Sequence, residues 1–232
     1  MDDPSLEAGL HDGALQGLGR INRLSGAARA LWREIQNSRP GVEACGSGSA
    51  GGRPVRILDV ASGGGDVAIA LARLAGARVR VEGCDVSVQA VAFAQKAAAA
   101  GGVADRVGFF VHDALSSPPG EAGSWDVILC SLFLHHLEEG QIGCLLRHLA
   151  ACGPRLLLIS DLRRSRLAWW FTRIGTLLLT RSPVVHVDGP RSVRAALTVS
   201  EMRGLLEASP FAGASIRRQW PMRMLVRWEG VA

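Results

Sequence analysis

Short apolar runs alternate with helix-like segments along most of this chain. The first, at 55–61, is a continuous apolar run, which is typical of a strand buried on both faces of a sheet. Four more segments predict strands, at 79–86, 107–114, 124–137, where the strand runs into a loop, and 155–162. Segments with apolar residues at helical spacing lie between them, at 67–75, 88–101 and 138–152. Because strands and helices alternate over short links, we expect a mostly parallel sheet with helices on both faces, which is a doubly wound α/β fold.

The N-terminal part departs from this alternation. Residues 14–36 carry apolar groups at mixed three- and four-residue spacing and predict one or two helices. The Gly, Ser and Pro residues of 44–54 predict a flexible connection. We therefore expect a helical cap and linker at 1–54 and the main domain at 55–232.

The C-terminal part predicts one more helix and a hairpin. Thr198 or Ser200 would cap the start of the helix, and Glu201 would favour its first turn. Two short β-like runs follow, at 214–220 and 223–228. These runs predict a pair of terminal strands.

Charge is uneven along the chain, although the net charge is only +5. From Pro154 to the end there are 13 arginines and 5 acids, whereas the first 153 residues are net acidic. The basic part could meet phosphates or an anionic membrane face, or it could simply be a solvated arginine-rich surface. No dense basic run is interleaved with aromatic residues, so we expect no nucleic-acid partner.

The cysteines and the N-terminus bear on the compartment. The five cysteines are odd in number and scattered, the first residues are acidic, and no apolar run reaches the roughly 18 residues of a membrane span. An acidic start without an apolar core does not resemble a secretory signal. We therefore expect reduced thiols and a cytoplasmic protein, with contact at the inner face of the membrane left open.

A glycine-rich turn between the first apolar run and its helix carries the strongest chemical signal. Such a turn lets a ligand approach the backbone, and the helix start offers unpaired N–H groups to an anion. Gly63 and Gly65 fit the first two places of a dinucleotide motif, but Ala68 takes the last. Asp59, four residues before Gly63, disfavours a pyrophosphate and favours the ammonium group of an amino acid.

The run from Asp59 to Asp66, DVASGGGD, resembles the first motif of class I S-adenosylmethionine-dependent methyltransferases, especially the C-methyltransferases of ubiquinone and menaquinone synthesis. Three later acids follow in the family's order. Asp85 matches the acid that binds the ribose, Asp113 matches the acid near the adenine, and Asp126 begins a run similar to the fourth motif, beside the methionine moiety. Singly, each is as readily a turn former or a helix cap.

The resemblance implies a seven-stranded, mostly parallel, Rossmann-like sheet, with a lid insertion after the fifth strand at 163–197. It implies S-adenosylmethionine as the cofactor and no metal. The residues that it places at the cofactor are Asp59, Ala61, Ser62, Gly63, Gly65, Asp85, Val86, Asp113, Ala114 and Ser131.

The N-terminal helix adds a second resemblance to the quinone group. Residues 22–25, NRLS, and 31–33, LWR, are similar to a signature that precedes the glycine motif and lies over the cofactor in those enzymes. An amphipathic helix that packs Leu24 and Trp32 on the core explains the same residues equally well.

Three histidines are candidate catalytic bases, because imidazole transfers protons near neutral pH. His135 and His136 follow the fourth apolar run, and His186 lies before the last helix. In the wider superfamily such a pair often only packs or orients a loop. Asp161 and Arg164 follow the fifth run, where family members shape the acceptor pocket, but they could equally form a surface pair.

A repeat of metal-ligating residue types is present on one predicted helix. Cys144, His148 and Cys152 recur every four residues and would share one face. Small buried residues on a packed face are the commoner explanation, so we expect no metal.

An apolar segment at 165–185 is the main clue to the acceptor. Trp169 and Trp170 lie in it beside a run of leucines, with arginines at its edges. A lid of this kind fits a lipophilic acceptor. The segment also fits shallow docking on a membrane surface, core packing or a dimer face.

These observations predict methyl transfer to carbon or oxygen of a small lipophilic aromatic acceptor, such as a phenol, hydroquinone or polyketide. Residues 130–133, CSLF, replace the N/D-P-P-Y/F pattern of enzymes that methylate amides or nucleobases. Beyond residue 163 the chain departs from the quinone enzymes, which makes secondary metabolism an equal expectation. A nucleotide-dependent oxidoreductase and a non-catalytic cofactor-binding protein stay open, as does the oligomeric state.

Overall fold

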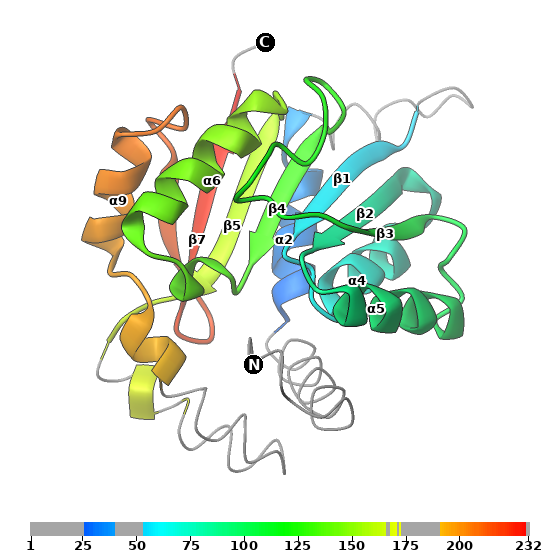
Figure 1. The fold of residues 1–232 in the computed structure, drawn as a ribbon, viewed down its shortest axis with the longest axis horizontal. Helices are drawn as coiled ribbons and strands as arrows, with labels where there is room; N and C mark the ends of the chain where they lie inside the picture. Colours follow the sequence, from blue (N-terminus) through cyan, green and yellow to red (C-terminus); the bar gives the residue numbers. More distant parts are fainter. Residues whose placement is uncertain (1–25, 40–52, 166–167, 171, 173–190, 231–232) are drawn as a thin grey trace.

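The computed structural model describes residues 26–39, 53–165, 168–170, 172 and 191–230, and these build one seven-stranded sheet (Figure 1). The strand order is β3-β2-β1-β4-β5-β7-β6. Strands β1 to β5 are parallel, and β7 is antiparallel to both β5 and β6. The strands are β1 (Val55–Val60), β2 (Val79–Asp85), β3 (Val107–Val111), β4 (Val127–Ser131), β5 (Leu156–Leu162), β6 (Ser215–Gln219) and β7 (Arg223–Glu229). The predicted fold class is confirmed.

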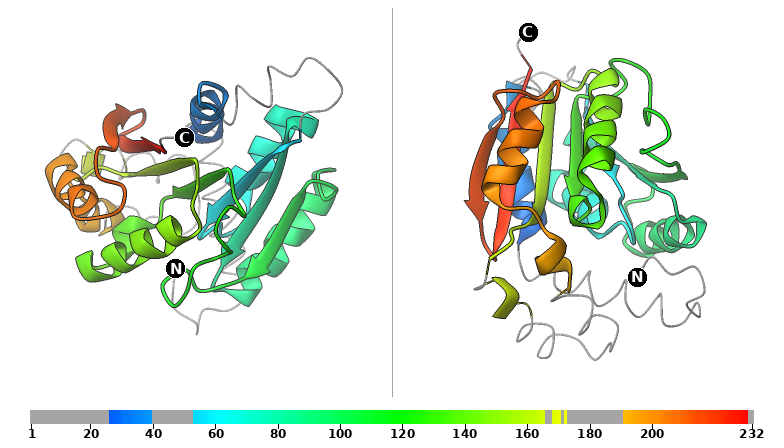
Figure 2. Two further views of the ribbon diagram at one scale, coloured as in Figure 1. Left: turned by 90° about the horizontal axis from the view of Figure 1, so that it is seen from above. Right: turned by 60° about the vertical axis from the view of Figure 1, so that its left-hand side comes forward.

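Helices cover both faces of the sheet. Figure 2 shows α2 on one side of the strands and α6 on the other. One apolar core joins the sheet to α2 (Ala27–Gln36), α4 (Asp66–Ala75) and α5 (Val88–Ala100). The other core joins it to α6 (Glu139–Ala151) and α9 (Val199–Glu207). Because both faces are covered, the central strands are almost continuously buried, as their apolar runs require.

Helix α2 packs into the main core rather than standing apart from it. Leu31, Trp32 and Ile35 are buried in that core. The guanidinium of Arg78 lies 5.2 Å from the centre of the Trp32 ring. The packing account of Trp32 is thus observed, whereas residues 22–25 and most of the predicted linker lie outside the described residues. The division after residue 54 stays a prediction.

Helix α9 begins where the sequence indicates. The Thr198 hydroxyl accepts a hydrogen bond from the Glu201 N–H at 3.3 Å, and the Glu201 carboxylate accepts one from the Thr198 N–H at 2.8 Å. This reciprocal pair satisfies two backbone donors at the helix start. Thr198, not Ser200, is therefore the cap.

The fourth apolar run forms a shorter strand than predicted. Strand β4 ends at Ser131, and Leu132 has a φ of 57°, a left-handed conformation that turns the chain out of the sheet. A 3₁₀ helix, Leu134–His136, follows at once. The two histidines therefore lie just beyond the strand, at the edge where the parallel strands end.

Asp126 lies at the opposite edge of the sheet from the glycine turn, at the start of the run that resembles the fourth motif. It directly precedes Val127, the first residue of β4, whereas the turn follows the last residue of β1. Its carboxylate accepts two hydrogen bonds of 2.6 Å from the Arg53 guanidinium and one of 2.9 Å from the Arg56 N–H. At the edge of the glycine turn this run presents Ser131, the last residue of β4.

We expect Asp126 to stabilise the fold. Burial alone would raise the pKa of Asp126, but the hydrogen bonds and charges of Arg53 and Arg56 outweigh it and hold the pKa below the ordinary value. Asp126→Asn should therefore lower the free energy of unfolding by about 2 kcal/mol at neutral pH, the cost of losing charged hydrogen bonds. Urea unfolding at several pH values measures this.

The difference in unfolding free energy between the wild type and Asp126→Asn should depend on pH, because the folded pKa of Asp126 is lowered. A carboxylate with a lowered folded pKa stabilises above its unfolded pKa, and the contribution is lost as the pH falls through the folded value. The wild-type and Asp126→Asn curves should therefore converge in acid, below the ordinary aspartate pKa. A gap that persists at low pH would contradict the ion-pair explanation.

Candidate active site

The glycine turn sits between β1 and α4. The Ser62 N–H donates to the Cys84 carbonyl at 2.9 Å, and the Gly65 N–H donates to the Ser62 carbonyl at 2.9 Å. Ala61, Gly63 and Gly65 all have left-handed φ angles, of 54°, 52° and 74°. Only glycine adopts that region without cost, so Gly63 and Gly65 suit the conformation of the turn, whereas Ala61 adopts it at a cost.

Two glycines let an aromatic ring come close to this turn. A Cβ on Gly65 would lie 2.5 Å from Cζ of Phe109, and a Cβ on Gly83 would lie 2.5 Å from its Cδ1. The Phe109 ring on β3 thus packs directly against the backbone of the turn and of β2. Gly83 was not among the expected site residues, and a lone glycine within an apolar run is the one signal that points to such a close approach.

Asp85 ties the end of β2 to the turn. Its carboxylate accepts hydrogen bonds from the Gly63 N–H at 2.8 Å and from the Ser87 N–H at 2.9 Å. The next residue, Val86, is 67% exposed and leaves an apolar surface beside the acid. The end of β2 is therefore hydrogen-bonded to the turn that follows β1, as the resemblance implies.

Asp113 follows β3 at the same edge. The hydrogen bond from the Leu115 N–H and the Ser116 hydroxyl lower the pKa of Asp113 below its ordinary value. The carboxylate is exposed, whereas the neighbouring Ala114 is buried. Asp113 is therefore an ionised group that faces solvent near the turn side of the sheet.

Three polar atoms buried near the ends of β1 and β4 make no hydrogen bond within the described part of the chain: Oδ2 of Asp59, Oγ of Ser62 and Oγ of Ser131. Burial, the Asp66 charge and the Asp85 charge raise the pKa of Asp59 well above its ordinary value, and the Ala68 N–H opposes this shift. Asp59 is only 2% exposed. Buried polar atoms without partners are rare, and a group of them marks a place where a polar ligand could complete the bonding.

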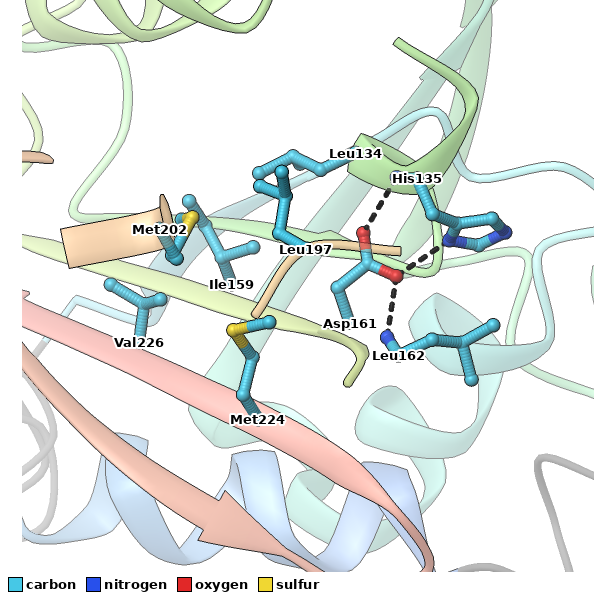
Figure 3. A pocket seen from close by; sticks show the side chains of 9 residues that line it. All are labelled: Leu134, His135, Ile159, Asp161, Leu162, Leu197, Met202, Met224 and Val226. Atoms are coloured by element: carbon cyan, nitrogen blue, oxygen red, sulfur yellow. Dashed lines mark hydrogen bonds and ion pairs between the residues drawn. The ribbon is translucent and has the colours of Figure 1, made fainter. Parts of the chain in front are cut away.

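His135, just beyond β4, and Asp161, near the end of β5, form a buried pair (Figure 3). Nδ1 of His135 lies 2.6 Å from Oδ1 of Asp161, and both side chains are 5% exposed. The carboxylate also accepts hydrogen bonds from the His135 N–H at 3.2 Å and the Leu162 N–H at 2.6 Å. An ionised carboxylate only accepts, so Nδ1 is the donor, and in the neutral imidazole Nε2 is then the acceptor.

The other two histidine candidates are placed differently. His136 is exposed, and its ring centre lies 4.2 Å from that of His135. His186 lies outside the described residues. Of the two candidates that the structure describes, His135 is the one whose ring nitrogen is seen to contact a buried carboxylate.

An apolar pocket lies against this pair (Figure 3). Apart from His135 and Asp161, its lining is entirely apolar: Leu134, Ile159, Leu162, Leu197, Met202, Met224 and Val226. The two methionines come from α9 and β7, more than 40 residues beyond β4, and no motif marks them. The cavity measures only about 10 Å³, room for about one water molecule, so these side chains form a packed apolar wall behind the pair.

The remaining acceptor candidates lie near the surface. Arg164 forms an exposed ion pair with Glu201. Trp169 packs edge-on against Trp170 at 5.1 Å, with the Arg194 guanidinium 5.5 Å from the Trp169 ring, and Trp170 is 58% exposed. Most of the expected lid at 163–197 lies outside the described residues. No helix in the part that the structure describes is long and apolar enough to cross a membrane.

The Cys144, His148 and Cys152 side chains contact backbone carbonyls. Cys144 Sγ lies 3.5 Å from the Leu115 carbonyl, and His148 Nδ1 lies 2.9 Å from that of Ala114. Cys152 Sγ donates to the Gly120 carbonyl at 3.3 Å. Across the described ranges, no group of three or more histidine, cysteine or acidic residues is arranged to hold a metal ion.

Comparison with known proteins identifies part of this chain. Residues 57–153, from β1 to the end of α6, match the family described as "Methyltransferase domain". The release factor glutamine methyltransferase of Chlorobaculum tepidum is 37% identical over 107 residues, which are 45% of this chain and 35% of that protein. The chain therefore spans about a third of the length of that curated relative.

Solved structures share the fold at low sequence identity. A SAM-dependent methyltransferase from Aquifex aeolicus has a TM-score of 0.65 at 17% identity, covering 98% of this chain and all of the other. Human N-acetylserotonin methyltransferase in complex with SAM has a TM-score of 0.66 at 14% identity, with coverage of 97% and 57%. An O-methyltransferase family 2 protein from Planctomyces limnophilus, in complex with apigenin, gives 0.59 at 21%, with coverage of 89% and 62%.

These findings confirm that the chain contains a methyltransferase domain with the fold of S-adenosylmethionine-dependent enzymes. S-adenosylmethionine, predicted here from the acid series, is the cofactor named for such neighbours. The finer resemblance to the quinone C-methyltransferase group stays a prediction, and so do the roles of the individual site residues.

Proposed function

We propose that this protein transfers a methyl group from S-adenosylmethionine to a small lipophilic aromatic acceptor that carries a hydroxyl group. The observation that carries the proposal is the 2.6 Å contact between His135 and Asp161, at the sheet edge where the glycine turn also lies. A histidine oriented by a buried carboxylate is suited to remove a proton from a hydroxyl group.

The residues at the turn fit the cofactor. Asp59 would face the ammonium group of the methionine moiety, Asp85 the ribose and Asp113 the adenine, by analogy with the family. The buried unpartnered atoms of Asp59, Ser62 and Ser131 support a polar ligand at this place. When bound, S-adenosylmethionine supplies a methyl group on a positively charged sulfur.

The chain's own residues would handle the proton. His135 Nδ1–H donates to Asp161, so Nε2 can accept the proton of the acceptor hydroxyl. The acceptor then reacts from its oxygen, or through a ring carbon made electron-rich by the ionised oxygen. In the second case the hydrogen on that carbon leaves as a proton after the transfer, and the oxygen regains a proton as the ring becomes aromatic again. The proton ends on Nε2, and the Asp161 carboxylate stabilises the resulting imidazolium. The enclosing loops mainly align the reactants and exclude water.

Two observations support the acceptor class. Trp170 is 58% exposed and offers an aromatic surface. The matched proteins include one bound to apigenin and one named for N-acetylserotonin, which are small aromatic compounds. A quinone, polyketide or other secondary metabolite fits this description.

Glutamine methylation is the second candidate, since the curated relative carries that name. Residues 130–133 lack the N/D-P-P-Y/F pattern expected for amide acceptors. A glutamine-containing peptide therefore belongs in the acceptor screen, and its methylation in place of phenols would replace the aromatic proposal.

Calorimetric titration of S-adenosylhomocysteine, S-adenosylmethionine and NADH tests the cofactor. Asp85→Ala should weaken binding of the first two by roughly 100-fold, since charged hydrogen bonds are worth about 1.5–3 kcal/mol each. Asp105→Ala is the matched control, because Asp105 is an exposed acid whose ion pair with Arg106 lies at the surface. Binding of NADH alone would favour an oxidoreductase, and binding without methyl transfer would favour an accessory protein.

A further inference from the structure

A row of polar side chains lies on one face of the sheet, near the end where the parallel strands finish. Ser131 pairs with Ser160 between β4 and β5, and Ser160 pairs with Leu225 of β7. Two residues before Leu225, the buried Arg223 pairs with Gln219, the last residue of β6. Paired residues point to the same face and side chains alternate along a strand, so Ser131, Ser160 and Gln219 share one face.

This face is the one that carries Asp59, the acid proposed to meet the cofactor. Asp59 pairs with Leu129 between β1 and β4, and Leu129 lies two residues before Ser131. Leu129 and Leu225 both belong to the core that joins the sheet to α2, α4 and α5. The polar row therefore starts on the strand next to the cofactor acid and runs toward the β6–β7 hairpin.

A hydrogen bond holds one end of the Gln219 amide. The Ser160 hydroxyl donates to Oε1 of Gln219 at 3.0 Å, and it does so across β7, which lies between β5 and β6. Nε2 of Gln219 is buried and makes no hydrogen bond within the described part of the chain, and the same holds for Oγ of Ser131. Because Ser160 occupies Oε1, the two N–H donors of Nε2 are the end of the amide that stays available.

A buried amide with unused donors costs free energy, because the donors lose water and gain no partner. An apolar side chain of the same length would fill the place without this cost. Such groups are therefore rare in folded proteins, and they mark places where a ligand completes the bonding. The partner that suits an N–H donor is an oxygen with a free lone pair, such as a carbonyl oxygen.

We propose that the Ser160–Gln219 pair is an acceptor subsite, in which the Gln219 amide donates a hydrogen bond to a carbonyl oxygen of the aromatic acceptor. The inference rests on the proposed function and narrows its substrate class to hydroxylated aromatic compounds that also carry a carbonyl group. Gln219 is then a residue that determines specificity, and Ser160 positions its amide.

The subsite and the proposed base flank the end of one strand. Ser160 and Asp161 are consecutive residues of β5, so their side chains point to opposite faces, and Asp161 holds His135 on its side. An acceptor that lies across this strand end presents its hydroxyl group to His135 and its carbonyl group to Gln219. The next residue in the hairpin, Trp220, is 70% exposed and offers an aromatic surface at the same edge.

Matched acceptors test the subsite directly. The hydroxyacetophenone isomers and the ethylphenols of the same ring positions differ mainly in a carbonyl group that replaces a methylene group. Wild-type kcat/KM should favour the hydroxyacetophenones by about tenfold or more, because the ethylphenols leave the amide donors unpaired. Gln219→Met keeps the length of the side chain but not its donors, and should remove most of this preference. Arg218→Met should keep the preference, because the neighbouring Arg218 is exposed and points to the other face.

A stability measurement separates a binding role from a structural one. In the Ser160→Ala background, Gln219→Met should leave the midpoint of thermal unfolding of the free protein unchanged or raise it, because a half-paired amide is replaced by an apolar group. With S-adenosylhomocysteine present, hydroxyacetophenone should raise the midpoint of the wild type more than that of Gln219→Met. A lowered midpoint in the double variant together with an intact carbonyl preference would make the pair purely structural.

The outcomes distinguish the subsite from the proposed function. No carbonyl preference in the wild type, or a preference that Gln219→Met leaves intact, would overturn the subsite, whereas methylation of the ethylphenols would still support the function. If the wild type methylates neither class, the function fails, and calorimetric titration of the same compounds with S-adenosylhomocysteine present decides the subsite. Hydroxyacetophenone binding that Gln219→Met weakens would support it, and equal or absent binding would overturn it. If Gln219→Met does not fold, Gln219→Leu and Ser160→Ala carry the same comparisons.

Discussion

Replacing His135 with alanine is expected to lower the turnover rate of methyl transfer by about 100- to 10,000-fold, the usual contribution of a general base. S-adenosylhomocysteine affinity should stay near the wild-type value, because the observed contacts of the His135 side chain are with Asp161 and His136, and not with the proposed cofactor residues at the ends of β1 to β4. Production of S-adenosylhomocysteine, measured with a panel of phenols and hydroquinones, provides the rate.

Asp161→Asn should also lower the turnover rate of methyl transfer. An amide cannot hold the proton on Nδ1 as a carboxylate does, nor stabilise the imidazolium that forms. His136→Ala is the matched control, because His136 is the neighbouring residue of the same type but is exposed, whereas His135 is buried against Asp161. A larger loss for His136→Ala than for His135→Ala would assign the base to His136 instead.

Gly65→Ala is expected to lower the free energy of unfolding by about 3 kcal/mol. Two costs add: the left-handed φ of 74°, at about 1–2 kcal/mol for a residue with a Cβ, and overpacking against Phe109, at about 1–3 kcal/mol. Because the turn also holds the proposed cofactor residues, ligand affinity should fall with stability. Urea unfolding and calorimetry measure the two effects.

Two further variants separate the backbone cost of Gly65→Ala from its overpacking cost. Gly102 has a φ of 66°, and a Cβ added there would have no other atom within 4 Å, so Gly102→Ala should show the backbone cost alone, about 1 kcal/mol. Phe109→Leu should recover part of the loss in the Gly65→Ala background, because it removes ring atoms that the new methyl group would meet. Equal losses for Gly65→Ala and Gly102→Ala would show that the contact with Phe109 is unimportant.

Local sequence was sufficient for the strands, most helices and the cofactor turn. Continuous apolar runs marked β1 and β5 because both faces of these strands are covered, whereas β2 begins with alternating buried and exposed residues. Thr198 and Glu201 marked the start of α9 because a capping box is a contact between residues three apart. The turn after β1 was also recognisable from local sequence, because its glycines allow the left-handed φ angles that the backbone adopts at those positions.

The assembly of the site depended on which ends of the strands meet. Asp126 and Ser131 flank the two ends of β4, and only Ser131 lies at the edge of the glycine turn, because parallel strands bring residues at like ends together. His135 and Asp161 were separate candidates, 26 residues apart, until β4 and β5 paired and set Nδ1 against the carboxylate. Pairing register acts through space, so no short motif encodes it.

Arg223 and the apolar pocket were decided by tertiary structure alone. The sequence contains many arginines, and the antiparallel pairing of β7 with β5 places this one at a buried position at the end of the sheet. Met202 and Met224 line the pocket because α9 and β7 pack over β5. Local patterns thus determined the conformation of each segment and its chemical class, whereas contacts between distant segments determined which side chains share one site, because burial and charge depend on neighbours that the chain brings from elsewhere.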